Sequence, residues 1–227
     1  MTTLRIDCIL FDLDGTLVDS APDLLAAVNR VLVDTGREQL PLATLRPVVS
    51  KGSRAMLATA FPDLDDEARE QLVQPFLDYY GAAIAEHGRA FDDIELLLSR
   101  LERAGLRWGI VTNKPEKLAR AVVQAMGWSE RCAVLIGGDT LAAKKPDPAQ
   151  LLHASELLGF TPDRCVYVGD DERDIQAARA AGMPSVVALW GYREAHEDPA
   201  SWGADRSIGF PLELCFGLVD GFGRDKY

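Results

Sequence analysis

The chain has 227 residues, enough for one α/β domain that carries a smaller inserted domain. Hydrophobic residues make up 48% and charged residues 26%, a composition typical of a soluble globular protein and not of an intrinsically disordered chain. The formal net charge of −11 argues against nucleic acid or an anionic membrane as the main partner. We expect a cytoplasmic protein with reduced cysteines, because we recognise no signal peptide, no bilayer-length apolar run and no zinc-ligand spacing.

Five short apolar runs predict buried parallel strands. In chain order they are Ile6–Leu13, Trp108–Thr112, Ala133–Ile136, Cys165–Val168 and Ser185–Leu189. Segments with helical periodicity alternate with these runs, and they end at Gly105, Gly127, Gly159 and Gly182. Strands that alternate with helices predict an α/β fold, a doubly wound parallel sheet with helices on both faces.

The segment after the first strand breaks this alternation, because it contains only helical patterns. Ser20 and Asp23 form a candidate capping box ahead of its first helix, and Pro75 marks the start of a later helix or a kink in it. We predict that residues 18–83 form an inserted α-helical cap domain over the strand ends. Residues 1–17 and 84–227 then form the core domain.

Polar residues follow four of the predicted strands. In chain order these groups are Asp12-Leu13-Asp14-Gly15-Thr16, Thr112-Asn113, Lys144-Lys145-Pro146 and Gly169-Asp170-Asp171. Ligands of parallel α/β sheets bind outside the carboxyl ends of the strands, so we expect the four groups to meet at one edge of the sheet. Carboxylates crowded in this way need a cation, and oxygen ligands favour Mg²⁺.

The residue types at this edge suit phosphoryl transfer. We expect the carboxylates of Asp12 and Asp170 and the backbone carbonyl of Asp14 to hold Mg²⁺. Asp12 is the candidate nucleophile, and Asp14 is the candidate acid for the leaving alcohol and the later base for water. Thr112 and Lys145 are expected to neutralise the phosphate oxygens, and Lys145 also to hold Asp12 in line.

The four motifs, in this order, resemble those of the haloacid dehalogenase superfamily over nearly the whole chain. Within it the chain is similar to the phosphoglycolate phosphatase branch, and the segments Val48–Met56 and Trp202–Asp205 look like those of bacterial N-acetylmuramic acid 6-phosphate phosphatases. The resemblance implies a Mg²⁺-dependent phosphatase with an aspartyl-phosphate intermediate. It implies 2-phosphoglycolate or a sugar phosphate, such as N-acetylmuramic acid 6-phosphate, as the substrate. Asp14 argues against the dehalogenases, which lack this second aspartate, and against the cation-pump ATPases, which carry threonine there.

Several further residues each allow two interpretations. Arg54 and Lys51 either contact the substrate or form an exposed basic turn. Asn113 either contacts the substrate or belongs to an ordinary turn. Asp174 either binds the metal or acts as a charge at a helix N-terminus, and Asp171 either orients a metal-bound water or is solvated.

Two other functions share these motifs. A sugar-phosphate mutase has all four and differs in how the cap protects the phospho-enzyme. A non-catalytic phosphoryl-sensing module also combines an acidic Mg²⁺ site with a threonine and a lysine, but it is shorter and has no counterpart of Asp14. The expected partner is a small phosphorylated metabolite, and the sequence allows a monomer or a homodimer.

Overall fold

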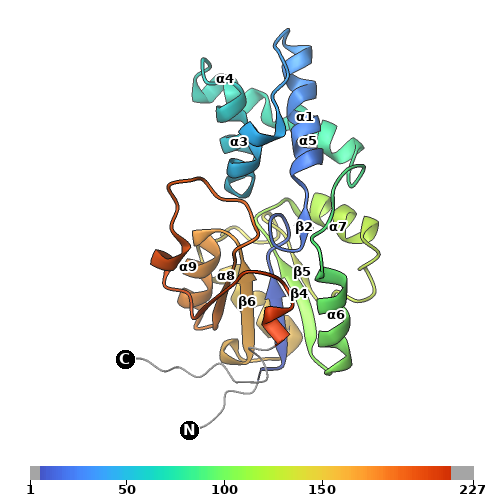
Figure 1. Ribbon diagram of the computed structural model, residues 1–227, viewed down its shortest axis with the longest axis vertical. Helices are drawn as coiled ribbons and strands as arrows, with labels where there is room; N and C mark the ends of the chain where they lie inside the picture. Colours follow the sequence, from blue (N-terminus) through green and yellow to red (C-terminus); the bar gives the residue numbers. More distant parts are fainter. Residues whose placement is uncertain (1–5, 216–227) are drawn as a thin grey trace.

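The structure is a computed structural model that describes residues 6–215. A six-stranded sheet forms its centre, in the order β5-β4-β1-β6-β7-β8, and every neighbouring pair is parallel. The strands are β1 (Cys8–Phe11), β4 (Arg107–Val111), β5 (Leu135–Ile136), β6 (Cys165–Gly169), β7 (Ser185–Ala188) and β8 (Arg206–Ile208). Figure 1 shows the sheet in the lower half of the molecule and a group of helices above it.

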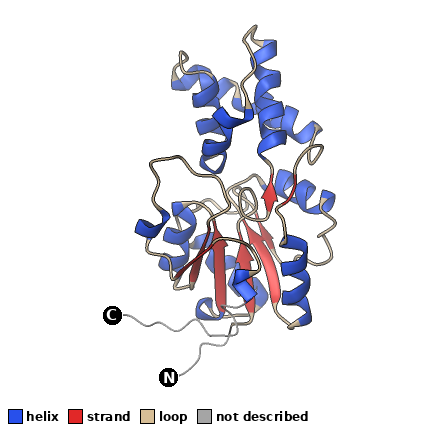
Figure 2. Cartoon of the chain, in the orientation of Figure 1, coloured by secondary structure: helices blue, strands red, loops and turns tan. Residues whose placement is uncertain are grey.

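Successive residues of the strands point to opposite faces of the sheet, and both faces are buried. Ile9 and Phe11 of β1 belong to the hydrophobic cluster that includes α6 and α7, whereas Cys8 and Leu10 belong to the cluster of α8 and α9. These helices are α6 (Ile94–Arg103), α7 (Glu116–Ala125), α8 (Ala149–Leu158) and α9 (Glu172–Ala181). Helices therefore cover both faces (Figure 2), and the predicted doubly wound α/β fold is confirmed.

All five predicted strands are present, and three of them (β1, β5 and β7) are shorter than their apolar runs, whereas β4 and β6 differ from theirs by one residue at one end or at both. The sequence analysis missed the edge strand β8, because an edge strand is partly exposed and has no continuous apolar run. All four cysteines lie within the described residues and are free. Among residues 6–215, no helix is both long and apolar enough to cross a membrane.

A group of helices, which we call the helical layer, comes in the sequence after one short strand and before another. These strands, β2 (Val18–Asp19) and β3 (Arg89–Ala90), pair antiparallel, so that the chain enters and leaves the layer side by side. The layer consists of α1 (Ala21–Asp34), α2 (Leu42–Leu45), the 3₁₀ helix η1 (Arg46–Lys51), α3 (Ser53–Ala60), α4 (Asp66–Gln71) and α5 (Val73–Ala82). The cap-domain limits at residues 18 and 83 stay a prediction, and residues 1–5 and 216–227 of the predicted core lie outside the described residues.

Two details of the predicted helical segment differ in the structure. The capping box is wrong: the Ser20 hydroxyl donates a hydrogen bond to Asp14 (2.6 Å), not to the backbone of α1. The Asp23 carboxylate accepts hydrogen bonds from the backbone N–H groups of His87 (2.7 Å) and Gly88 (3.0 Å). Both side chains therefore form hydrogen bonds to partners outside α1, in place of the backbone groups of the predicted capping box. The later helix, α5, begins two residues before Pro75, where a proline costs no helical hydrogen bond.

The buried sheet predicts how stability responds to truncation. Ile110 lies within β4 and is fully buried, so Ile110→Ala should lower the free energy of unfolding by about 2–5 kcal/mol. Leu152, on the outer side of α8, is 40% exposed, and Leu152→Ala should cost less than about 1 kcal/mol. Urea denaturation measures both changes, and equal losses in the two variants would contradict this packing.

Candidate active site

The carboxyl edge of the sheet carries the predicted polar residues. Asp12 follows β1, Thr112 follows β4 and Asp170 follows β6, each directly after the last strand residue. Strand β1 lies between β4 and β6 and pairs in register with both along its whole length. The three side chains therefore start from adjacent points, and Lys145 reaches the same place from the loop after β5.

Three buried carboxylates form a cluster at this edge. Asp12, Asp170 and Asp174 each offer an oxygen, and these oxygens lie within 4.8 Å of one another. Burial, together with the charges of Asp12 and Asp174, raises the pKa of Asp170 well above its usual range. Burial also raises the pKa of Asp174, to about 6, although the charge of Lys145 opposes the shift. The cluster can stay fully ionised at neutral pH when a cation joins it.

The donor set of this cluster fits Mg²⁺. All three groups are carboxylates, and Mg²⁺ prefers oxygen ligands and needs only one or two protein carboxylates beside phosphate and water. Oδ1 of Asp12 is buried, and among the described residues its polar contact is the ion pair with Nζ of Lys145 at 3.0 Å, which leaves room for a second positive charge. This oxygen is therefore able to serve as a metal ligand.

Lys145 places a buried ammonium group beside the carboxylates. Its Nζ lies 3.0 Å from Oδ1 of Asp12 and 2.7 Å from Oδ1 of Asp174. It also donates to the hydroxyl of Tyr167 (2.8 Å) and to the backbone carbonyl of Val111 (3.1 Å). Burial alone would lower the pKa of Lys145, but the charges of Asp12 and Asp174 outweigh burial and raise it. Lys145 thus stays charged and ties Asp12 to Asp174.

Asp170 is held by partners from three parts of the chain. It accepts hydrogen bonds from the hydroxyls of Thr16 (3.0 Å) and Ser50 (2.7 Å) and from the backbone N–H of Tyr192 (2.9 Å). Gly15 has a φ of +84°, and a Cβ on it would lie 2.2 Å from Oδ2 of Asp170. Only glycine therefore fits against the Asp170 carboxylate at this turn.

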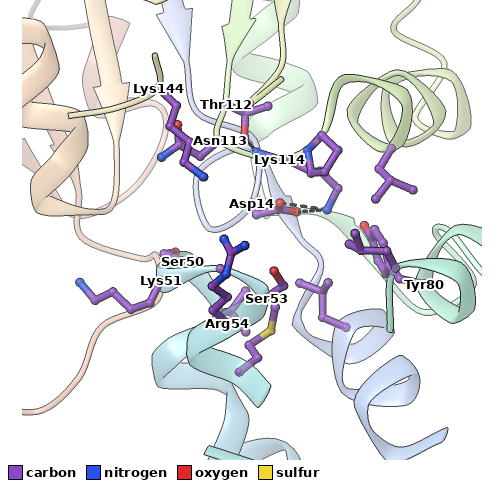
Figure 3. Close-up of a pocket in the computed structure, with 18 of the residues that line it drawn as sticks. Asp14, Ser50, Lys51, Ser53, Arg54, Tyr80, Thr112, Asn113, Lys114 and Lys144 are labelled. Carbon is purple, nitrogen blue, oxygen red and sulfur yellow. Dashed lines mark hydrogen bonds and ion pairs between the residues drawn. The ribbon is translucent and has the colours of Figure 1, made fainter. Parts of the chain in front are cut away.

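Asp14 forms an ion pair with Lys114, a residue that the sequence analysis missed (Figure 3). Nζ of Lys114 lies 2.9 Å and 3.1 Å from the two carboxylate oxygens, and Ser20 donates to the same carboxylate. Only 6% of the Lys114 side chain is exposed, and its Nζ lies 4.1 Å from the centroid of the Tyr80 ring of α5. Burial alone would lower the pKa of Lys114, but the charge of Asp14 raises it. The position of Lys114 directly after the Thr112-Asn113 motif is the sequence signal that could have identified it.

Asp171 and Asp174 form the capping box of α9. Asp171 accepts from the N–H of Arg173 (3.0 Å), and Asp174 accepts from the N–H of Asp171 (3.1 Å). Asp171 also lies 2.8 Å from Nζ of Lys51 and 2.7 Å from Nε of Arg173. Although burial opposes the shift, Arg173 and Lys51 lower the pKa of Asp171 to about 2. The interpretation of Asp171 as a solvated side chain is therefore wrong. Lys51 is no exposed turn residue either, because it pairs with Asp171 and Glu197.

A cavity of about 380 Å³ lies between the sheet edge and the helical layer. Asp12, Asp14, Thr112 and Asn113 line it from the sheet side, and Arg54 lines it from the layer. Figure 3 shows the Arg54 side chain extending toward Asp14. Arg54 is 69% exposed and pairs with Glu70 through two hydrogen bonds. The amide of Asn113 donates to the backbone carbonyl of Lys145 (2.9 Å), which joins two of the motifs.

The fold and the arrangement of these side chains are those of a known family of enzymes. Residues 6–182 match the model of the haloacid dehalogenase-like hydrolases, so the chain belongs to this family, and the predicted superfamily is confirmed.

Three known proteins illustrate what this chain is similar to. A phosphoglycolate phosphatase from Xanthomonas campestris pv. campestris is 60% identical over 206 residues, which cover 91% of this chain and 93% of that protein. An N-acetylmuramic acid 6-phosphate phosphatase from Pseudomonas aeruginosa is 42% identical over 215 residues, which cover 94% and 95%. The crystal structure of a predicted phosphoglycolate phosphatase from Haemophilus somnus has a TM-score of 0.83 and 27% identity, and the match covers 93% of this chain and 97% of that one.

The ion pairs of Asp171 predict a pH dependence of stability. Its pKa is about 2 in the folded protein and about 3.9 in an unfolded chain, so its charge stabilises the fold above about pH 4. This contribution is lost as the pH falls toward about 2. We expect Asp171→Asn to lower the free energy of unfolding by about 2 kcal/mol at neutral pH, and the difference from wild type to shrink below about pH 4.

Urea unfolding of both proteins at about pH 7, pH 5 and pH 3 measures this difference. Asp63→Asn is the control, because Asp63 forms a comparable pair with Arg37 at an exposed position, and its loss should change stability little. An Asp171→Asn difference that stays constant down to about pH 3 would contradict the assignment.

Proposed function

We propose that this hydrolase is a Mg²⁺-dependent, cytoplasmic phosphatase that cleaves a small phosphomonoester through an aspartyl-phosphate on Asp12. The enzyme class, a phosphoric monoester hydrolase, is confirmed by the family and by the names of the relatives. The position of Asp12 carries the proposal. It is buried, paired with Lys145 and close to two other carboxylates, and it lines the cavity that opens toward the helical layer.

We propose three protein ligands for the metal: the carboxylates of Asp12 and Asp170 and the backbone carbonyl of Asp14. A bound Mg²⁺ supplies positive charge that neutralises the phosphate oxygens and the ligating carboxylates. Asp174 lies in the same cluster, but its Oδ1 is 2.7 Å from Nζ of Lys145. We therefore propose that the main role of Asp174 is to hold Lys145, which in turn orients Asp12.

In the first step a carboxylate oxygen of Asp12 attacks the phosphorus. The bond from phosphorus to the ester oxygen breaks, its electron pair stays on that oxygen, and Asp14 gives the oxygen a proton. Lys145 keeps the carboxylate of Asp12 in line through the contact at 3.0 Å. Thr112 and Asn113, which follow β4 at the cavity, donate hydrogen bonds to the phosphate oxygens.

In the second step a water molecule attacks the phosphorus of the aspartyl-phosphate. The bond from phosphorus to the Asp12 oxygen breaks, inorganic phosphate leaves, and Asp14 takes up the proton of the water. Lys114 and Ser20 hold the ionised carboxylate of Asp14 in place for this step, at 2.9 Å and 2.6 Å. The helical layer limits the access of bulk water to the cavity.

Asp12→Asn tests the nucleophile. We expect Mg²⁺-dependent phosphate release to fall by more than about a thousandfold, because an amide oxygen cannot form the phospho-enzyme. The measurement is kcat/KM on a panel of small phosphomonoesters, with and without a chelator, and thermal unfolding serves as the folding control. Substantial turnover by a folded Asp12→Asn variant, or by wild type in excess chelator, would contradict the mechanism. Phosphoryl transfer to a second sugar phosphate would favour a mutase, and stable phosphorylation without turnover would favour a sensing module.

Lys114→Met tests the ion pair that orients Asp14. Methionine keeps an unbranched side chain but removes the charge, so we expect kcat to fall by about 10- to 100-fold and phospho-enzyme to accumulate. Mg²⁺ binding should not change, because Lys114 pairs with the carboxylate of Asp14 and not with the cluster of Asp12 and Asp170. Lys117→Met, at an exposed position of the same loop-helix segment, is the control. An unchanged kcat and no phospho-enzyme in the Lys114 variant would refute this role.

A further inference from the structure

Helix α5 turns one side toward the cavity. Val73, Phe76, Leu77 and Tyr80 line the cavity from this helix, and their spacing of three and four residues puts them on one helix face. Tyr80 is the one of the four whose side chain ends in a polar group, and only 1% of the residue is exposed. A polar side chain that is buried so deeply needs a partner.

The hydroxyl of Tyr80 does not supply this partner. Buried tyrosines usually place the O–H group against a hydrogen-bond partner, yet the hydroxyl of Tyr80 has none among residues 6–215. The ring makes the polar contact instead, because Nζ of Lys114 lies 4.1 Å from its centroid. An ammonium group within about 6 Å of a ring centroid is attracted by the negative charge density of the ring face.

The ammonium group of Lys114 depends on this ring. It donates to the two carboxylate oxygens of Asp14, at 2.9 Å and 3.1 Å, and Nζ has no other hydrogen-bond acceptor among the described residues. Since only 6% of the Lys114 side chain is exposed, water has little access to the third N–H. The ring face of Tyr80 therefore offsets part of the hydration that Lys114 loses on burial.

Two packing contacts hold the ring of Tyr80 in place. Phe76, one turn earlier in α5, stacks on it with ring centroids 6.5 Å apart and an angle of 13° between the planes. Helix α5 also packs closely on α7, because a Cβ on Gly81 would lie only 3.3 Å from a methyl carbon of Leu118. Helix α7 begins two residues after Lys114, so this packing keeps the ring beside the ammonium group.

We propose that Tyr80 is a positioning residue: its ring face holds the ammonium group of Lys114, and Lys114 in turn holds the carboxylate of Asp14 for both proton transfers. This inference rests on the proposed function and adds a residue to the same site. The ring and not the hydroxyl acts, because the ring is the part that contacts Lys114. A residue of the helical layer thus helps to orient a group at the sheet edge.

Two substitutions separate the ring from the hydroxyl. Tyr80→Phe keeps the ring, so kcat on the ester that wild type hydrolyses fastest should stay within about threefold of wild type. Tyr80→Leu removes the ring and should lower kcat by about 5- to 30-fold, with KM changed by less than about threefold. Tyr80→Met makes the same comparison if Tyr80→Leu does not fold, because methionine fills irregular apolar space.

Tyr79→Leu is the matched control. Tyr79 is the neighbouring residue of α5, and its ring also lies against a cation, with the guanidinium carbon of Arg30 5.6 Å from the centroid. Tyr79 does not line the cavity, and its hydroxyl donates to Asp34. We expect Tyr79→Leu to change kcat by less than about twofold.

A double-mutant cycle tests whether Tyr80 acts through Lys114. In the Lys114→Met background the ammonium group is gone, so Tyr80→Leu should lower kcat by less than about threefold further. A residue that only supports the fold would lose the same factor in both backgrounds.

NMR of protein with ¹³C-labelled lysine tests the contact without any turnover. The Cε–H signal of Lys114 is assigned by its absence in Lys114→Met. The ring current of Tyr80 should shift this signal upfield from that of the exposed Lys117. The shift should be retained in Tyr80→Phe and lost in Tyr80→Leu.

Three results would overturn this role of Tyr80 while the phosphatase stands. They are an equal loss of kcat in Tyr80→Phe and Tyr80→Leu, an undiminished effect of Tyr80→Leu in the Lys114→Met background, and a Lys114 signal that Tyr80→Leu leaves unchanged. Failure of folded wild type to release phosphate from any small phosphomonoester is a different result, because it would overturn the proposed function and this role with it.

Discussion

The site depends on the balance between its buried negative charges and the ammonium group of Lys145. Asp12, Asp170 and Asp174 crowd together out of water, where like charges repel strongly. Lys145 offsets part of this repulsion by contacting Asp12 and Asp174 at 3.0 Å and 2.7 Å. Burial, together with the remaining excess of negative charge, raises the pKa of Asp170, and this excess makes a divalent cation a natural partner of the cluster.

The same carboxylates connect the sheet edge to the helical layer. Ser50 of η1 donates to Asp170, and its backbone carbonyl accepts from Arg173. Lys51 of η1 pairs with Asp171 at the start of α9. The layer is therefore held by groups that belong to the acidic loop after β6. The position of the helical layer opposite the nucleophile therefore depends on the charges of that loop.

Much of the fold was predictable because its signals are local. A buried parallel strand needs an unbroken apolar run, and a helix beside it needs apolar residues with helical spacing. The sequence alone therefore predicted the strand at Trp108–Thr112 and the helix at Ile175–Ala181. The errors concern interactions between distant residues. Ser20 and Asp23 have the spacing of a capping box, yet their partners are Asp14 and the chain at His87 and Gly88. Strand β8 needs only one buried face, so its sequence carries no comparable signal.

By itself, the sequence determined the α/β fold class and the set of chemical groups at the sheet edge, because strand ends in a parallel sheet necessarily meet there. Only the tertiary structure decided which of these groups touch. Lys145, in the loop after β5, pairs with Asp12 at the end of β1, and Lys114, just after β4, pairs with Asp14 and lies against the Tyr80 ring of α5. The cavity likewise exists only because residues of α3, α5 and α7 pack opposite the sheet edge. Contacts of this kind depend on how elements pack, and spacing along the chain does not encode packing.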